Sequence, residues 1–99
     1  RCYTQTEIDQ QQLEEMVGQG AILVDVRSPQ EFAEGHLKNA ILLPEYEINK
    51  SVNDILPDKL QIIIVYCSTG HRSEKAQKKL IKLGYQKVYN LCKGLENIY

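Results

Sequence analysis

Short apolar runs that alternate with helical patterns constrain the fold of this chain more than any other feature. The runs cover residues 21–26, 40–43, 61–66 and 88–91. They are almost unbroken instead of alternating with polar residues, which is the pattern of strands buried on both faces. Strands of this kind separated by helices predict an α/β fold around a central, mainly parallel sheet with helices on both faces.

Helix start and stop signals lie between these runs. Asp9 stands three residues before Gln12, and Ser28-Pro29 stands before Glu31, so both sites have the pattern of a capping box. The expected helices run from residue 9 to 18 or 20, from 29 to 34, within 45–58 and over 73–83, with a helical turn over 94–99.

The composition indicates an ordinary globular chain. With 99 residues, 42% hydrophobic and 25% charged, residues 1–99 are expected to form a single domain. The longest apolar run is strand-sized, so no membrane partner is expected. The three cysteines, Cys2, Cys67 and Cys92, have no CxxC spacing and are odd in number, which argues against a disulfide framework. We therefore expect a cytoplasmic protein, and a removed leader stays open because the chain does not begin with Met.

The net charge of −1 hides an asymmetry along the chain. Residues 1–58 contain 4 basic and 11 acidic side chains, whereas residues 59–99 contain 8 basic and 2 acidic ones. The basic half includes Cys67 and suits a small anionic substrate. Its charges are too mixed to indicate a nucleic-acid partner, and a helix with a solvated lysine face would account for them equally well.

One apolar run ends in a cysteine, Cys67, at the start of a short polar loop that leads into a helix. Free backbone N–H groups and the positive end of the helix dipole are expected there, and both favour a reactive thiolate. Gly70 allows the loop to turn its N–H groups inward, and Arg72 closes it with a permanent charge, either braced against the fold or presented to an anion. In parallel sheets ligands bind beyond the carboxyl ends of strands, where Cys67 falls. The other polar loop residues are Ser68, Thr69, His71 and Ser73, the last also placed to start the helix.

A purely structural role, a histidine-based triad and a zinc site all fit Cys67 less well. A buried cysteine at the end of a strand is common, but it does not account for the glycine, arginine and hydroxyl residues that follow. The only histidines are His36 and His71, and nothing in the sequence orients either as a general base. His36 is expected to be a hydrogen-bonded structural residue. The cysteines and histidines match no zinc spacing, so we expect no metal and no cofactor.

Three blocks of the sequence resemble the rhodanese-like family. They occur in the family's order and together span about residues 6–99. The resemblance implies a compact α/β domain and a cysteine that accepts a sulfane sulfur as a persulfide and then passes it on. The blocks are Leu23-Val24-Asp25-Val26-Arg27-Ser28 with 31–32, 35–37 and 40–41; Cys67-Ser68-Thr69-Gly70-His71-Arg72-Ser73; and 84–85 with 88–91 and Gly94.

By position, the resemblance makes Cys67 the sulfur acceptor and residues 68–73 the loop that holds the persulfide. It makes Asp25 and Arg27 supporting residues of the fold and of the loop's surroundings. Where the family often has Gly, this chain has Lys93, which either adds positive charge beside the loop or is a plain surface lysine. Cys92 is either a resolving thiol or a bystander. Asn39 replaces another usual Gly and tolerates the left-handed conformation.

The resemblance implies a thiosulfate sulfurtransferase. Its partners would be a small anionic donor such as thiosulfate, or a persulfide, and a thiol, protein or cyanide acceptor, with the chain a monomer or weak dimer. One alternative is a protein-partnered sulfur-relay or binding module. Another is a small phosphatase or arsenate reductase, which is disfavoured because four residues separate Cys67 from Arg72 and related phosphatases have one more.

Overall fold

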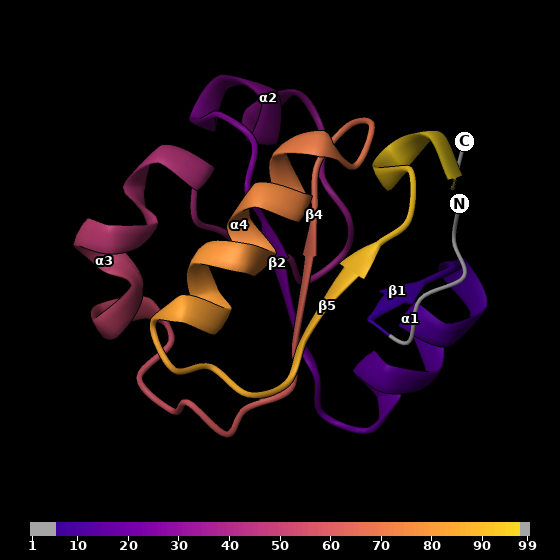
Figure 1. The fold of residues 1–99 in the computed structure, drawn as a ribbon. Coiled ribbons are helices and arrows are strands. Elements are labelled where there is room, and N and C mark those ends of the chain that lie inside the picture. Colours follow the sequence, from indigo (N-terminus) through magenta and orange to yellow (C-terminus); the bar gives the residue numbers. More distant parts are fainter. Residues whose placement is uncertain (1–5, 98–99) are drawn as a thin grey trace.

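A five-stranded parallel sheet forms the centre of the molecule, in the order β1-β5-β4-β2-β3. The computed structural model describes residues 6–97 of the chain (Figure 1). The α/β fold and the parallel sheet confirm the prediction made from the apolar runs. The strands are β1 (Glu7–Ile8), β2 (Ile22–Asp25), β3 (Ile41–Leu42), β4 (Ile63–Tyr66) and β5 (Val88–Leu91).

Helices cover both faces of the sheet, as Figure 1 shows. The helix α1 packs on one face, and α3 and α4 pack on the other, because their apolar residues belong to two separate core clusters. The helices are α1 (Gln10–Gly18), α2 (Pro29–Glu34), α3 (Ile48–Ile55) and α4 (His71–Lys82), and the short 3-10 turns are η1 (Glu45–Glu47) and η2 (Gly94–Asn97).

The strand β4 lies at the middle of the sheet, and all four of its residues are buried. Its successive side chains point to opposite faces, so Ile63 and Val65 join the cluster under α3 and α4, whereas Ile64 and Tyr66 join the cluster under α1. This is the reason for its unbroken apolar sequence. A strand that is covered on both faces has no position at which a polar side chain would reach water.

Both predicted capping boxes are present. The Asp9 side chain accepts the Gln12 N–H at the start of α1, and the Ser28 side chain accepts the Glu31 N–H at the start of α2. In each box the third helical residue reaches back to the cap's own N–H. Local sequence therefore sets where these two helices begin.

Three features differ from the predicted elements. The strand β1 has two residues and was not predicted, because so short a segment has no periodicity to detect. The expected buried strand over 40–43 is reduced to β3 at the sheet edge, where Ile41 is 38% exposed. Leu83 was expected to face inward from the end of α4 but is 37% exposed.

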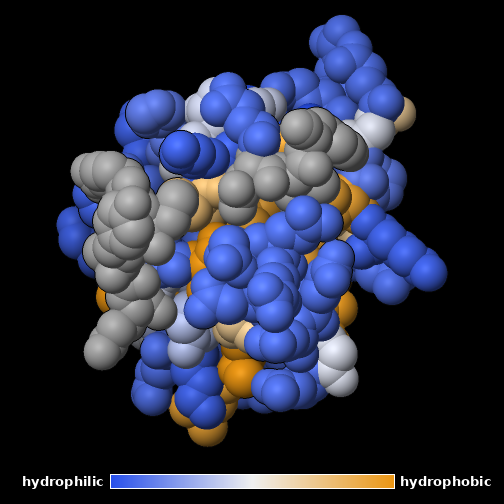
Figure 2. All heavy atoms as spheres, turned by 90° about the vertical axis from the view of Figure 1, so that its right-hand side faces the viewer, coloured by the Kyte–Doolittle hydropathy of each residue, from blue (hydrophilic) through white to orange (hydrophobic). Residues whose placement is uncertain are grey.

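The surface that includes α1 and β1 is mainly hydrophilic, with apolar atoms visible between polar side chains (Figure 2). Within residues 6–97 no helix combines the length and apolar character needed to cross a membrane.

Candidate active site

Cys67 is the first residue after β4, at the carboxyl end of the central strand. It is a free cysteine and only 1% exposed. Its neighbour Tyr66 is paired in register with Asp25, the last residue of β2. The sheet thus delivers the thiol to the edge where parallel α/β folds place their ligands.

The helix α4 begins earlier than its sequence pattern indicates. We expected Ser73 to cap a helix starting there, but the cap is Gly70, whose φ of 102° is left-handed, and the first helical residue is His71. Gly70 has no side chain that could supply a capping oxygen. A glycine fits because other residues adopt this backbone conformation only under strain.

The sulfur of Cys67 occupies the place of the missing cap. Its Sγ accepts the Gly70 N–H at 3.0 Å and the Ser73 N–H at 3.4 Å. Ser73 is the third residue of α4, whose N–H is the one that a capping side chain normally accepts. The first turn of α4 therefore directs N–H dipoles at the sulfur, an arrangement that stabilises negative charge there.

A hydroxyl group also contacts the sulfur. The Ser73 Oγ lies 3.5 Å from Cys67 Sγ, 2.5 Å from Asn90 Oδ1 and 3.2 Å from the Gly70 carbonyl oxygen. Asn90 belongs to β5 and is 2% exposed. The sequence analysis did not single out this residue. The signal that could have found it is an amide side chain inside an otherwise apolar strand.

The turn η2 fixes the other side of the loop. The Leu95 N–H donates to the Cys67 carbonyl at 3.0 Å, and the Glu96 N–H donates to the Ser68 carbonyl at 3.2 Å. Gly94, with a φ of 58°, allows this close approach, because a Cβ built on it would lie 2.1 Å from the Cys67 carbonyl oxygen. The loop carbonyls are thereby engaged by η2, while the Gly70 and Ser73 N–H groups face the sulfur.

Arg72 is braced against the fold, one of the two roles left open by its sequence. Its guanidinium donates to both carboxylate oxygens of Glu31, at 2.7 and 3.0 Å. Arg72 lowers the pKa of Glu31 to about 2, assisted by hydrogen bonds from Ser28, and Glu31 in turn raises the pKa of Arg72. The pair joins the start of α2 to the first turn of α4. Glu31 is a second residue whose link to the loop was missed, because its partner lies 41 positions away.

Asp25 and Arg27 form a buried network with Tyr66 beside the loop. Arg27 donates to Asp25 through Nε at 3.0 Å and through a terminal nitrogen at 2.8 Å, and it also reaches the Gly35 carbonyl. The Tyr66 hydroxyl donates to Asp25 Oδ2 at 2.8 Å and accepts the Leu37 N–H. Burial raises the pKa of Tyr66, so its hydroxyl keeps its proton. The network ties the ends of β2 and β4 to the segment that follows α2.

Three of the remaining predicted residues, Thr69, His71 and Lys93, line a hollow of about 360 Å³ beside the loop, and Ser68 is not among its lining residues. Thr69 and His71 are exposed, and Ser68 is half-buried. Lys93 adopts a left-handed φ of 63° and lies against Gly70, so it adjoins the loop. The hollow is lined by Glu7, Thr69, Gly70, His71, Glu74, Asn90, Cys92 and Lys93.

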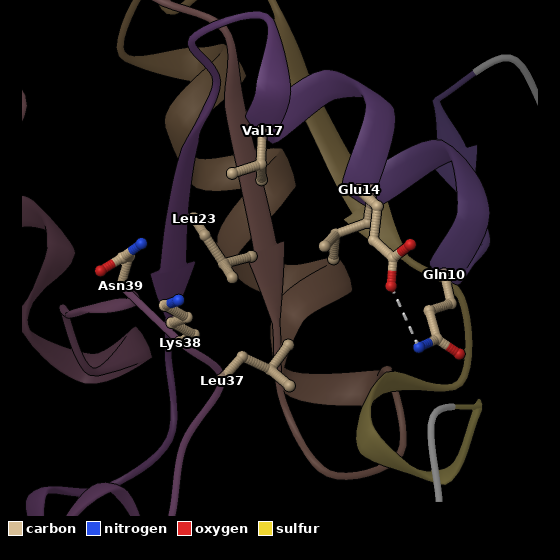
Figure 3. A pocket seen from close by; sticks show the side chains of 8 residues that line it. Gln10, Glu14, Val17, Leu23, Leu37, Lys38 and Asn39 are labelled. Atoms are coloured by element: carbon tan, nitrogen blue, oxygen red, sulfur yellow. Dashed lines mark hydrogen bonds between the residues drawn. The ribbon is translucent and has the colours of Figure 1, made fainter.

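A second hollow, of about 350 Å³, lies between α1, β2 and the segment after α2 (Figure 3). Val17, Leu23 and Leu37 face it, and a hydrogen bond joins Gln10 to Glu14 at its rim. It contains none of the predicted site residues.

Two other polar residues named from the sequence, His36 and Asn39, have structural roles. The His36 ring nitrogen Nδ1 lies 2.8 Å from the Phe32 carbonyl, and the ring stacks on Phe32, which agrees with the structural role expected for it. Asn39 has a φ of 65°, the left-handed conformation predicted for it.

Cys92 corrects an expectation. It is disulfide-bonded in this structure, so it is not the resolving thiol that the sequence left open, and the odd cysteine count was misleading. An odd number of cysteines is compatible with one disulfide and one separate nucleophile.

The comparison with known families agrees with this geometry. Residues 9–99 match the rhodanese-like domain. The chain belongs to the rhodanese-like family. This rhodanese-like domain is 35% identical over 75 residues to thiosulfate sulfurtransferase PspE of Escherichia coli, covering 76% of this chain and 71% of PspE.

Two further relatives extend the match. Thiosulfate sulfurtransferase GlpE of Pseudomonas syringae is 33% identical over 89 residues, covering 90% of this chain and 82% of GlpE. The human single-domain sulfurtransferase TSTD1 has the same fold, with a TM-score of 0.86, 21% identity and 96% of each chain covered. The rhodanese-like domain is thus a member of a family that includes sulfurtransferases.

Proposed function

We propose that this rhodanese-like domain is a sulfurtransferase that moves a sulfane sulfur from thiosulfate or a persulfide donor to a thiol or cyanide through a persulfide on Cys67. The observation that supports this most directly is the pair of N–H groups, from Gly70 and Ser73, aimed at Cys67 Sγ. The names of PspE and GlpE support thiosulfate as a donor.

The proposed reaction consists of two displacements. The Cys67 thiolate attacks the outer sulfur of thiosulfate, the S–S bond of the donor breaks, and sulfite leaves with the bonding electron pair. The product on the domain is the Cys67 persulfide anion. An acceptor thiolate or cyanide then attacks the outer sulfur, which leaves as a new persulfide or as thiocyanate and regenerates the Cys67 thiolate. Such covalent catalysis predicts ping-pong kinetics.

The charges around the site suit a small anion. Because Arg72 is committed to Glu31, we assign the stabilisation of the persulfide to the loop amides and to the N-terminus of α4. We assign Ser68, Thr69, Gly70, His71, Arg72 and Ser73 to the persulfide-binding loop, Asp25 and Arg27 to its support, and to Lys93 the positive charge at the rim of the hollow.

Steady-state kinetics test this proposal. With thiosulfate and cyanide both varied, thiocyanate formation should give parallel double-reciprocal lines, and Cys67→Ser should abolish it. The matched control is Ser51→Ala, on α3 and away from the loop, which should leave the rate unchanged. Intersecting lines, or a Cys67→Ser variant with full activity, would contradict a persulfide intermediate.

A protein-partnered relay is a second candidate, and the burial of the sulfur favours it. Cys67 is 1% exposed, so free thiosulfate meets little of this residue at the protein surface. The relay predicts slow loading by thiosulfate and fast loading by a persulfidated protein. Equal rates with the two donors would favour the small-molecule enzyme.

The compartment is part of the same proposal. The cysteine count was the ground for expecting a cytoplasmic location, whereas the disulfide at Cys92 counts against a reducing compartment. The redox state of the cysteines in the isolated protein distinguishes a reducing, cytoplasmic compartment from an oxidising one.

A further inference from the structure

The hydroxyl group of Ser73 has one proton to donate but more than one neighbour that could accept it. It has one proton, yet its Oγ lies within reach of two oxygen acceptors, Asn90 Oδ1 at 2.5 Å and the Gly70 carbonyl at 3.2 Å. The shorter contact identifies Asn90 Oδ1 as the main acceptor. The Ser73 oxygen therefore presents lone pairs to Cys67, and at 3.5 Å the thiol S–H donates to it.

This arrangement fits the thiol and does not fit an anionic sulfur. A thiolate or a persulfide anion has no proton to donate, so the lone pairs of Ser73 would face a negative charge. The hydroxyl can stabilise the anion only if its proton turns toward the sulfur, which removes the hydrogen bond to Asn90 Oδ1. When the sulfur is a thiolate or a persulfide anion, the Ser73 proton points to the sulfur, and Ser73 Oγ is left facing Asn90 Oδ1 with no proton between them. A group that donates to Ser73 Oγ would then fit better than an acceptor.

The side-chain amide of Asn90 can supply that donor. Half a turn about its last side-chain bond exchanges the oxygen for the NH₂ group, which then donates to Ser73 Oγ while Ser73 donates to the sulfur. Among the described residues, the hydrogen bond to Ser73 is the only one made by the Asn90 side chain, so no second hydrogen bond opposes the rotation. The backbone of Asn90 is held in place because its N–H donates to the Thr6 carbonyl at 2.8 Å.

We propose that Asn90 is a positioning residue whose amide reverses with the charge on Cys67: its oxygen accepts from Ser73 when the sulfur is a thiol, and its NH₂ donates to Ser73 when the sulfur is a thiolate or persulfide. The inference rests on the proposed function for its role in sulfur transfer. Asn90 acts through Ser73 and does not touch the sulfur. An aspartate could serve only as the acceptor, and an apolar residue could serve as neither.

The neutral variants used in the test below leave the charged side chains near Asn90 and Ser73 in place. Arg72 is close enough to Cys67 to interact with its charge. The titratable side chains that share the hollow with Asn90 are Glu7 on β1, His71 and Glu74 on α4, and Lys93 after β5.

The test is the pH profile of Cys67 alkylation by iodoacetamide, which reports the thiolate fraction and needs no sulfur donor. Ser73→Ala should raise the midpoint by about one pH unit, which is about a tenfold lower ionisation constant of the thiol, because one hydrogen bond to the anion is lost. Asn90→Leu should raise it by roughly half a unit. In the Ser73→Ala background, Asn90→Leu should add almost nothing, since the neutral amide acts only through the hydroxyl.

Three outcomes would overturn the proposal. A lowered midpoint in Asn90→Leu would show that the amide only withholds the Ser73 proton from the sulfur. An unchanged midpoint would show that Asn90 is merely structural, and an undiminished effect without the Ser73 hydroxyl would show that it acts by another route.

Two further variants serve as a matched control and as a substitute in case Asn90→Leu does not fold. Gln77→Leu is the matched control, because Gln77 lies one turn along α4, is buried and bonds the Val88 carbonyl of β5, yet has no contact with the sulfur. It should lower stability without moving the midpoint. If Asn90→Leu does not fold, Asn90→Asp replaces it and should raise the midpoint, with a smaller increase in the Ser73→Ala background; an equal increase contradicts the proposal.

The two proposals fail separately. If the unaltered domain takes up no sulfur but the variants move the midpoint as stated, the proposed function is wrong and the amide reversal stands. If the domain takes up sulfur and Asn90→Leu lowers the midpoint or leaves it unchanged, only the amide reversal is wrong.

Discussion

At the scale of single residues, the site depends on one sulfur atom that takes the place of a helix-capping group. Cys67 Sγ accepts N–H groups that would otherwise be free at the start of α4. The same contacts that begin the helix therefore prepare the sulfur for negative charge.

Gly94→Ala tests how closely the loop is held. The new Cβ would lie 2.1 Å from the Cys67 carbonyl oxygen, and a φ of 58° also strains a residue with a side chain. We expect the free energy of unfolding to fall by roughly 2 kcal/mol or more, together with a large loss of sulfur transfer. Urea unfolding and thiocyanate formation measure the two effects.

Gly18→Ala is the control for this prediction. Gly18 ends α1, and a Cβ built there meets nothing within 4 Å. Replacement should leave transfer unchanged and stability equal or slightly higher. If Gly94→Ala were as harmless as Gly18→Ala, η2 would not position the loop.

At the scale of elements, the ends of β2, β4, α2 and α4 are joined by two polar connections. The buried one includes Asp25, Arg27 and Tyr66, and the more exposed one pairs Glu31 with Arg72. Each connects segments that lie far apart in the sequence. Their energies should differ, because burial decides the cost of leaving a charged group without its partner.

The buried network should respond strongly to loss of its carboxylate. Asp25→Ala leaves Arg27, whose side chain is 7% exposed, without its ion pair, and should cost about 3–5 kcal/mol of unfolding free energy. Tyr66→Phe removes one hydrogen bond to the Asp25 carboxylate and one from the Leu37 N–H but keeps the ion pair, and should cost about 1–3 kcal/mol. Urea denaturation distinguishes the two, and an Asp25→Ala variant no less stable than Tyr66→Phe would contradict this ranking.

The Glu31–Arg72 pair should make stability depend on pH in a defined direction. The pKa of Glu31 falls from its ordinary 4.5 to about 2 in the folded domain, so its contribution is present above about pH 5 and is lost as the pH falls toward 2. Because both side chains are partly exposed, Glu31→Gln should cost about 0.5–1 kcal/mol at neutral pH.

Thermal unfolding from pH 7 to pH 2 measures this dependence. The two proteins should differ near neutrality and converge near pH 2. A difference that stays constant over the whole range would mean that the carboxylate charge is not the cause.

At the scale of the whole molecule, the sequence predicted what depends on local pattern. The apolar runs of β2, β4 and β5 and the capping boxes at Asp9 and Ser28 are local, and the structure confirms them. Cys67 and its loop were also proposed as the site from local pattern, since a strand, a glycine and a helix follow one another. The resemblance to the rhodanese-like family is confirmed by the family match over residues 9–99.

Features that depend on distant partners were not predicted. β1 exists because it pairs with β5, which lies more than 80 residues later in the chain. Asn90 matters because β5 brings it to Ser73, and Arg72 is braced because α2 presents Glu31. The start of α4 was misplaced because a sulfur, and not a serine hydroxyl, accepts the first N–H groups.

The cysteines give a prediction for the molecule as isolated. With Cys92 disulfide-bonded, thiol titration of the unfolded, unreduced protein should detect fewer thiols than the three cysteines of the chain. Reduction should restore all three. Three thiols before reduction would instead agree with a reducing, cytoplasmic environment.

Intact mass spectrometry after exposure to thiosulfate tests the central claim most directly. The unaltered protein should gain the mass of one sulfur atom, map it to the peptide containing Cys67, and lose it on addition of cyanide, whereas Cys67→Ser should gain nothing. No gain with either thiosulfate or a persulfide donor, or an equal gain by Cys67→Ser, would contradict it.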